Sequence, residues 1–148
     1  MIVLWVMLVS LLVARGAGAL GLSPLDGWPA ATRAGLATMF VFTGIAHFSR
    51  TRADLVRMVP PQLPNAGALV TLTGIAEFAG AVGLLVPGVE RWAAYGLMLL
   101  LVALFPANVY AWRVGHTIAG RPHTPMRWRL PLQLLWIGLL WWSVRAVS

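Results

Sequence analysis

Apolar residues gather in five long runs along this chain of 148 residues, and shorter polar segments separate the runs. Each run is near the roughly 20 residues that an α-helix needs to cross the hydrocarbon core of a bilayer. Because no linker or low-complexity tract divides the chain, we expect residues 1–148 to form a single domain. The pattern predicts an all-α integral membrane protein. The expected spans are 2–21, 29–49, 66–86, 92–112 and 130–147.

The first apolar run admits a second interpretation. The stretch from Ile2 to Ala14, followed by Arg15 and small residues, is similar to the hydrophobic region and cleavage site of a signal peptide. A signal peptide usually begins with a positively charged segment, and no such segment precedes this run. We therefore expect a retained helix over 2–21, and a cleaved signal is the alternative.

The composition supports a membrane protein, since 59% of the residues are hydrophobic and only 10% are charged. The chain contains no cysteine. This excludes a thiolate nucleophile, a cysteine-bound iron–sulfur cluster and a cysteine-based zinc site within the chain. Any thiol redox chemistry must therefore come from partner proteins.

The arginines predict the orientation in the membrane. All eleven basic residues are arginines, and seven of them lie in the loops 50–65 and 113–129. By the positive-inside rule, these loops and the N-terminus are cytoplasmic and the C-terminus is outside. The arginines flank the apolar runs and form no continuous stripe, so they indicate contacts with anionic lipid of the bilayer and not with nucleic acid.

A segment of six residues occurs twice within the apolar runs. Residues 43–48 read TGIAHF and residues 73–78 read TGIAEF, so only the ionisable fifth residue differs. The shared small and β-branched residues favour close packing between membrane helices, and an internal duplication is the alternative. The expected points of close approach are Gly44, Gly74, Ala76, Gly80, Ala81 and Gly83.

Glu77 and His47, the two residues that differ, are the candidates for proton transfer. Glu77 lies roughly 16 Å from the inner end of its span, where an ionised carboxylate costs several kcal/mol, so it should face the bundle interior. His47 should lie about 12–14 Å shallower than Glu77, because consecutive spans are antiparallel. We therefore expect two stations on one polar path and not a facing pair. Alternatively, His47 is an interfacial residue bonded to a backbone carbonyl.

Other polar residues fall in the same inner half of the predicted bundle and are candidates for ligand binding. Pro106, inside the fourth span, frees the carbonyl oxygen of Val102 for water, a ligand or a side chain. The predicted ligand-binding residues are Thr43, Thr73, Asn108, Tyr110, Arg113 and Gln133.

Several short motifs together resemble the DoxX-like membrane proteins. The motifs are Gly44-x-x-His47-Phe48, Met58-Val59-Pro60-Pro61-x-Leu63-Pro64, Gly74-x-x-Glu77, Phe105-Pro106-Ala107-Asn108-Val109-Tyr110 and Arg129-Leu130-Pro131-Leu132-Gln133. The resemblance runs from about residue 30 to the end of the chain. It implies a compact bundle of four core transmembrane helices in a bacterial inner membrane, linked to quinone or sulfur redox systems or to oxidative-stress partners. The segment 2–21 departs from that pattern and is either an additional helix or a signal segment.

Three functions fit these residues. The first is a redox-associated membrane subunit that binds a quinone or another lipophilic molecule, with Glu77 as acid and base and His47 exchanging protons with the cytoplasm. The second is an isomerase or cyclase acting on a lipophilic substrate, and the third is a non-catalytic binder, anchor or assembly factor. Haem or metal binding is less favoured, because no ligand-spacing motif joins His47 to His116 or His123.

Overall fold

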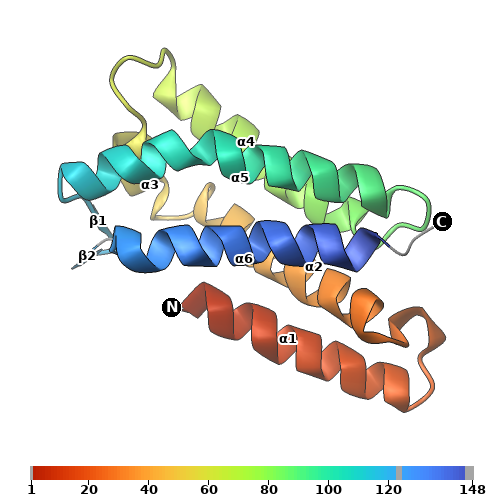
Figure 1. Cartoon of the computed structure of the whole chain (residues 1–148). Coiled ribbons are helices and arrows are strands. Elements are labelled where there is room, and N and C mark those ends of the chain that lie inside the picture. The colour runs from red at the N-terminus through yellow and green to blue at the C-terminus, as the bar shows by residue number, and fades with distance from the viewer. Residues whose placement is uncertain (1, 123–124, 146–148) are drawn as a thin grey trace.

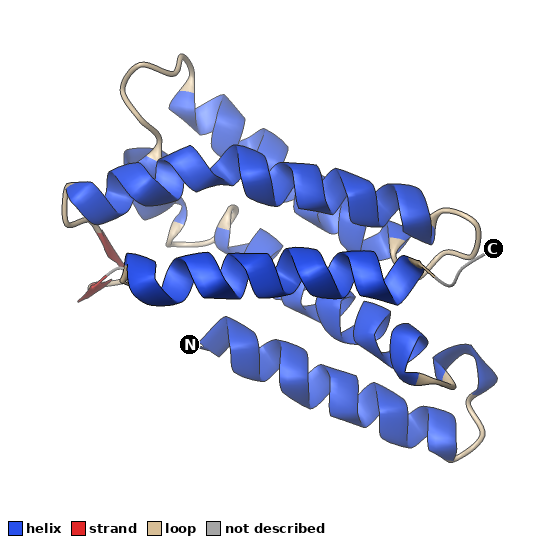
Figure 2. Cartoon of the chain, in the orientation of Figure 1, coloured by secondary structure: helices blue, strands red, loops and turns tan. Residues whose placement is uncertain are grey.

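The computed structural model describes residues 2–122 and 125–145 and consists mainly of α-helices (Figures 1 and 2). A long helix lies within or across each of the five ranges that the apolar pattern predicts. These helices are α1 (Ile2–Ala19), α2 (Trp28–Ala46), α4 (Ala66–Gly83), α5 (Glu90–Arg113) and α6 (Met126–Val144).

The connecting segments contain short elements that the sequence did not predict. A 3₁₀ helix, η1 (Ser23–Leu25), joins α1 to α2, and the short helix α3 (Arg52–Met58) occupies much of the 50–65 loop. In the 113–129 loop, β1 (Thr117–Ile118) pairs antiparallel with β2 (Arg121–Pro122). Elements of this length are too short to impose a recognisable periodicity on the sequence.

Successive long helices alternate in direction, so the two termini lie at opposite ends of the bundle (Figure 1). Helix α2 packs against α1, α4 and α6, and α5 packs against α4 and α6. Segments 47–65 and 114–122 lie at one end, which we call the arginine-rich end. Segments 20–27 and 84–89 lie at the other, which we call the opposite end.

Three helices of the described part of the chain, α1, α4 and α5, are long and apolar enough to cross a membrane. Helices α2 and α6 have 19 residues each and are long enough as well. They carry charges inside, Arg33 in α2 and Arg127 and Arg129 in α6, which lower their mean hydropathy. Length and composition therefore support three of the five predicted spans.

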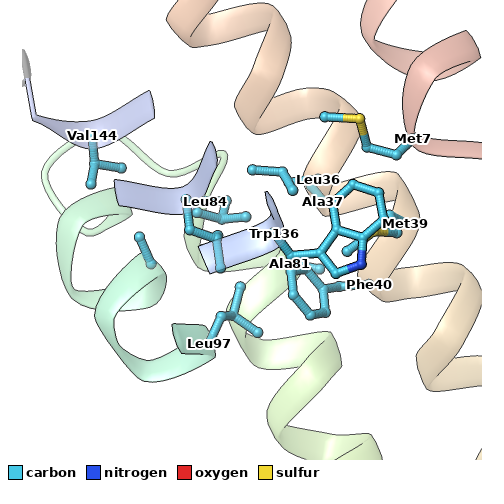
Figure 3. Packing of buried hydrophobic residues seen from close by; sticks show 12 residues of the cluster. Met7, Leu36, Ala37, Met39, Phe40, Ala81, Leu84, Leu97, Trp136 and Val144 are labelled. Atoms are coloured by element: carbon cyan, nitrogen blue, oxygen red, sulfur yellow. The ribbon is translucent and has the colours of Figure 1, made fainter. Parts of the chain in front are cut away.

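Buried apolar side chains from all five long helices form one packed group, which we call the apolar cluster (Figure 3). On α4, α5 and α6 its members lie in the half of each helix nearer the opposite end. Trp136 is only 6% exposed within it. The members are Met7, Leu36, Ala37, Met39, Phe40, Ala81, Leu84, Ala94, Leu97, Trp136, Leu140 and Val144.

Glycines bring the helices close together, as the sequence predicts. A Cβ atom on Gly83 would lie 2.7 Å from the Cβ of Ala93 in α5, and one on Gly80 would clash with Leu97. Real Cβ atoms do not approach this closely, so a larger residue would push α4 and α5 apart. The expected close approach at Gly80 and Gly83 is confirmed.

Candidate functional site

The two copies of the repeated segment face each other across the contact between α2 and α4. The ring of Phe78 covers Gly44, where a Cβ atom would lie 3.2 Å from it. In the same way, Phe48 covers Gly74, where a Cβ atom would lie 2.7 Å from the ring. The two rings stack with their centroids 5.9 Å apart. The glycine of each copy thus contacts the phenylalanine ring of the other copy. The two copies are therefore related by an approximate local two-fold axis.

The threonines that begin the two copies also occupy equivalent places. Each hydroxyl bonds to the backbone carbonyls three and four residues earlier in its own helix, at 3.0–3.2 Å. Thr43 makes a further contact that Thr73 lacks, since its Oγ1 lies 2.7 Å from Oε2 of Glu77 in α4. The hydrogen bond between Thr43 and Glu77 therefore breaks the local two-fold symmetry. It does so at the position where the two copies differ, which is Glu77 in one copy and His47 in the other.

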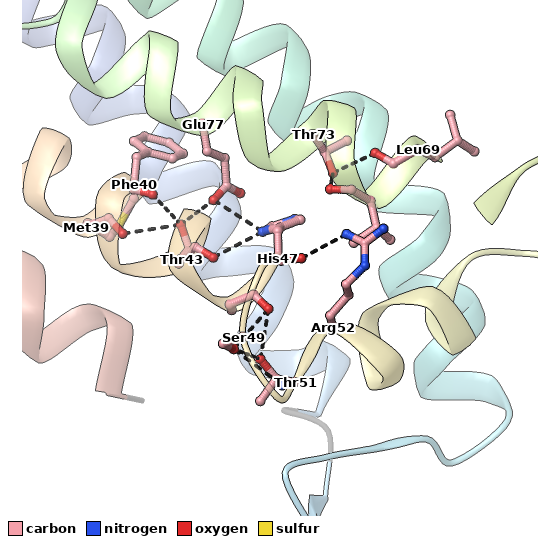
Figure 4. A network of polar contacts seen from close by, with 12 residues as sticks. Met39, Phe40, Thr43, His47, Ser49, Thr51, Arg52, Leu69, Thr73 and Glu77 are labelled. Carbon is pink, nitrogen blue, oxygen red and sulfur yellow. Dashed lines mark hydrogen bonds and ion pairs between the residues drawn. The ribbon is translucent and has the colours of Figure 1, made fainter. Parts of the chain in front are cut away.

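Glu77 and His47, which are buried, and Thr43, which is half-buried, form a polar group that we call the Glu77 site (Figure 4). Glu77 is 5% exposed and His47 is 8% exposed. The Nδ1 atom of His47 lies 3.9 Å from Oε2 of Glu77 and 3.1 Å from the carbonyl oxygen of Thr43. An imidazole that donates from Nδ1 to this carbonyl keeps the lone pair of Nε2 for a proton. The site therefore joins two proton-binding groups.

The prediction that His47 lies about 12–14 Å shallower than Glu77 is wrong. It assumed that α2 continues to residue 49 and that α2 and α4 reach the same level at the arginine-rich end. Helix α2 ends at Ala46, and the first turns of α4 extend past that end to contact α3. His47 is thereby level with Gly74, one turn from Glu77, and the two ionisable side chains meet.

Arg52, at the start of α3, lies beside this group on the side of the arginine-rich end (Figure 4). Its Nη1 donates to the carbonyl oxygen of His47 at 3.0 Å. Its Nη2 lies 2.9 Å from the carbonyl oxygen of Gly67 and 2.9 Å from Oγ1 of Thr71, both in α4. Sequence reasoning missed this role, because nothing in the sequence separates Arg52 from the other arginines of its loop.

Gln133 contacts a different helix from the one that carries Glu77. Its Nε2 donates to the carbonyl oxygen of Leu101 at 2.9 Å and so joins α6 to α5. Leu101 comes directly before Val102. The carbonyl oxygen of Val102 is the one that Pro106 leaves without a backbone hydrogen-bond donor. The side chain of Gln133 therefore fastens two helices at the proline-containing part of α5.

The remaining predicted ligand-binding residues lie near the end of α5. The ring of Tyr110 lies tilted against His116, with the centroids 6.1 Å apart. Arg113 is exposed, and Asn108 is half-buried with no side-chain hydrogen bond to any other described residue. The structure thus brings together Thr43, His47 and Glu77 but not the whole predicted set.

The described residues contain no group of three or more His, Cys, Asp or Glu residues arranged to hold a metal ion. His123, one of the two partners considered for His47 in a bis-histidine haem site, lies outside the described residues.

A family model with the description "Domain of unknown function (DUF8561)" matches residues 36–145. The chain belongs to this family. The DUF8561 region begins inside α2, so it contains both copies of the repeat and the whole Glu77 site but not α1. No curated protein and no solved structure matches the chain. The function of this DUF8561 protein must therefore be argued from its own residues.

Proposed function

We propose that this DUF8561 protein is a multi-pass protein of the bacterial inner membrane, with α2, α4, α5 and α6 as its core and α1 as an addition. Large apolar side chains on the outer faces of the helices support this, for example Leu72 at 63% and Leu99 at 71% exposure. Apolar faces of this kind are stable against lipid, whereas in water they favour aggregation. The excess of arginine at one end supports a cytoplasmic N-terminus.

We further propose that the Glu77 site binds and releases protons for a quinone-like or other lipophilic molecule in a redox-associated membrane subunit. The observation that carries this proposal is a carboxyl group and an imidazole within 3.9 Å of each other, both buried between two helices. Ionisable groups inside a membrane bundle commonly belong to proton relays or substrate sites. At 3.9 Å the two groups are beyond hydrogen-bond distance, so in this proposal a proton passes between Glu77 and His47 through one bridging water molecule.

The chemistry of quinones fits such a site. Reduction of a quinone takes up electrons and protons, and the protons go to its carbonyl oxygens. In this proposal a redox partner supplies the electrons, and the Glu77 site supplies the protons. The resemblance to DoxX-like proteins supports the same proposal, because the motifs that carry it include both His47 and Glu77.

Mass spectrometry of the lipids that co-purify with the protein tests this function. We expect the wild-type chain to retain a quinone or a related lipophile, and Glu77→Gln, which keeps the shape but cannot ionise, to lose most of it. Thr73→Val is the matched control, since Thr73 lies in the other copy of the repeat and, among the described residues, bonds only within α4. If the wild-type chain retains no lipophile and Glu77→Gln supports normal growth, the proposed function is wrong.

A structural role as an anchor or assembly factor is the second candidate. Two contacts favour it: Gln133 joins α6 to α5, and Arg33 donates from Nη1 to the carbonyl oxygen of Ser143 at 2.7 Å. Polar contacts between membrane helices typically contribute about 0.6 kcal/mol each. In this case Glu77→Gln lowers stability without changing which lipids co-purify.

A further inference from the structure

Polar side chains lie on only one side of Glu77 along α4. Thr73, Glu77 and Ala81 follow at intervals of four residues and so share one face of the helix. On the side of Thr73 lie the imidazole of His47, the guanidinium of Arg52 and the hydroxyl of Thr71, which Arg52 contacts at 2.9 Å. The polar groups therefore continue from Glu77 towards the arginine-rich end.

On the other side of Glu77, the apolar cluster fills the space between the helices. Ala81 on α4 and Leu84, the residue that follows α4, are each 1% exposed, and Leu97 of α5 is also 1% exposed. From Glu77 to Leu84 this layer is about 10 Å deep along the helix axis. A water molecule or an ion inside it would lack hydrogen-bond partners, which costs several kcal/mol.

A separate group of polar residues lies beyond this layer, at the opposite end, without a contact among the described residues that joins all of them. Glu90 is 6% exposed there, and Arg33 donates from Nη1 to the carbonyl oxygen of Ser143. Glu90 begins α5, and Leu97 lies two turns further along that helix, within the apolar cluster. The cluster therefore separates this group from the Glu77 site.

We infer that the Glu77 site exchanges protons and water with the arginine-rich side only, along the contact between the end of α2 and the first turns of α4. Arg52 lies at the outer end of that contact, which we call the mouth. This inference rests on the proposed function, because it requires that the helices span a membrane. It extends the proposed function by naming the side of the membrane from which protons reach a lipophile bound at this site. With the arginine-rich end in the cytoplasm, that side is the cytoplasm.

Arg52 acts in this inference as a positioning residue. Its bonds to the carbonyl oxygens of His47 and Gly67 hold the end of α2 against α4. Loss of these bonds frees the two helix ends to separate, which opens the mouth without touching Glu77 itself. Arg57 lies on the same short helix, but its side chain is 63% exposed and bonds to Asp54.

The absence of native cysteine makes access to the site directly measurable, because a single introduced cysteine is the only thiol in the chain. Thr73→Cys and Ala81→Cys place a thiol one turn to either side of Glu77 on the same face. Gln62→Cys and Pro87→Cys, at exposed positions of the two ends, report the two faces of the membrane. The probe is a charged, membrane-impermeant methanethiosulfonate, applied to sealed vesicles of either orientation.

We expect Gln62→Cys and Pro87→Cys to react from opposite faces, Thr73→Cys from the face of Gln62 alone, and Ala81→Cys from neither face. Thr71→Cys replaces Thr73→Cys if the latter does not fold. In the Thr73→Cys background, Arg52→Ala should speed the reaction about tenfold, the equivalent of one or two lost hydrogen bonds. Arg52→Lys should restore part of the slow rate, and Arg57→Ala should leave the rate unchanged.

The outcomes separate this inference from the proposed function. Reaction of Ala81→Cys or Thr73→Cys from the face of Pro87 overturns one-sided access while the membrane topology stands. The same conclusion follows if both Thr73→Cys and Thr71→Cys fold and react from neither face. If Gln62→Cys and Pro87→Cys react from the same face, the proposed membrane topology fails and the inference fails with it.

Discussion

Thr43 and Thr73 are the same residue in the same local sequence, yet only Thr43 contacts an ionisable group across the helix pair. Both hydroxyls bond to carbonyls of their own helices at nearly the same distances. The 2.7 Å contact between Thr43 and Glu77 is the one clear difference. At the scale of single residues, the chain therefore provides its own control for the hydrogen bond that holds the buried carboxyl group.

Thr43→Val should destabilise the protein more than Thr73→Val does. Valine keeps the branched shape in both cases, so neither variant leaves a large cavity. Thr43→Val leaves a buried carboxyl oxygen without its partner, at a cost of about 1–3 kcal/mol, whereas Thr73→Val should stay within about 0.5 kcal/mol of the wild type. Unfolding in detergent micelles measures both free energies, and equal losses would show that the bond to Glu77 adds nothing.

Asp54 in α3 gives a second prediction at the scale of single residues. The backbone N–H of Ala119, at 2.9 Å, and the side chain of Arg57 hold the pKa of Asp54 below its ordinary value of 3.8. A carboxyl group whose pKa is lowered by folding stabilises the folded state above its ordinary pKa, and this contribution disappears as the pH falls through the lowered value. Acid should therefore release the hairpin of β1 and β2 from α3.

Hydrogen exchange at the amide of Ala119 measures this release. We expect its protection factor to fall as the pH drops below 3.8, the ordinary pKa of the carboxyl group. Asp54→Asn should show weak protection at every pH and no step in this range. Asp26→Asn is the control, because Asp26 lies at the other end of the bundle near Arg15. Protection in the wild type that does not change with pH would contradict the prediction.

The repeat acts as a packing unit at the scale of elements. Gly44 receives Phe78 and Gly74 receives Phe48, so the same six residues form both sides of the contact between α2 and α4. His47 and Glu77 are equivalent positions in this arrangement, and each lies near the other because the contact is antiparallel. We therefore infer that the fold requires one carboxyl group and one imidazole at positions 47 and 77. It constrains less strongly which of the two positions holds which group.

Exchange of the two residues tests this equivalence. His47→Glu places two carboxyl groups close together, and Glu77→His places two imidazoles there, so each single variant should lose stability. The double variant restores one of each, and the threonine hydroxyl can donate to or accept from either group. We expect a favourable coupling free energy of about 1–3 kcal/mol in a double-mutant cycle. Additive losses in the double variant would show that the two positions are not equivalent.

The sequence predicts the elements of this fold better than their relative positions. Apolar runs of about 20 residues locate the long helices, and small residues locate close contacts such as Gly80 and Gly83. Hydropathy cannot set the offset between neighbouring helices, because each end of a run is uncertain by several residues and each residue shifts the level by about 1.5 Å. That offset decides whether His47 meets Glu77. Arg52 was missed for a related reason, since its partners depend on α3, which is only seven residues long.

At the scale of the whole molecule, α1, η1 and the first turns of α2 lie outside the matched DUF8561 region. The matched region begins at residue 36, and α1 packs against α2 and η1. The contact depends on Gly35, where a Cβ atom would lie 2.9 Å from the Cβ of Leu11 and 3.0 Å from the carbonyl oxygen of Met7. The Glu77 site lies between α2 and α4 and makes no use of α1. Loss of the α1 contact should therefore leave the site intact.

Gly35→Leu tests this independence. The larger side chain should push α1 away from α2, so that the 20–27 segment is cleaved faster by protease and the thermal midpoint falls. The Thr43–Glu77 bond should keep its strength, measured as the further loss of stability that Thr43→Val causes in the Gly35→Leu background. Gly96→Leu is the matched control, because a Cβ atom on Gly96 meets nothing within 4 Å and leucine favours the helix. If Gly35→Leu instead prevents the whole chain from folding, α1 is part of the core and not an addition to it.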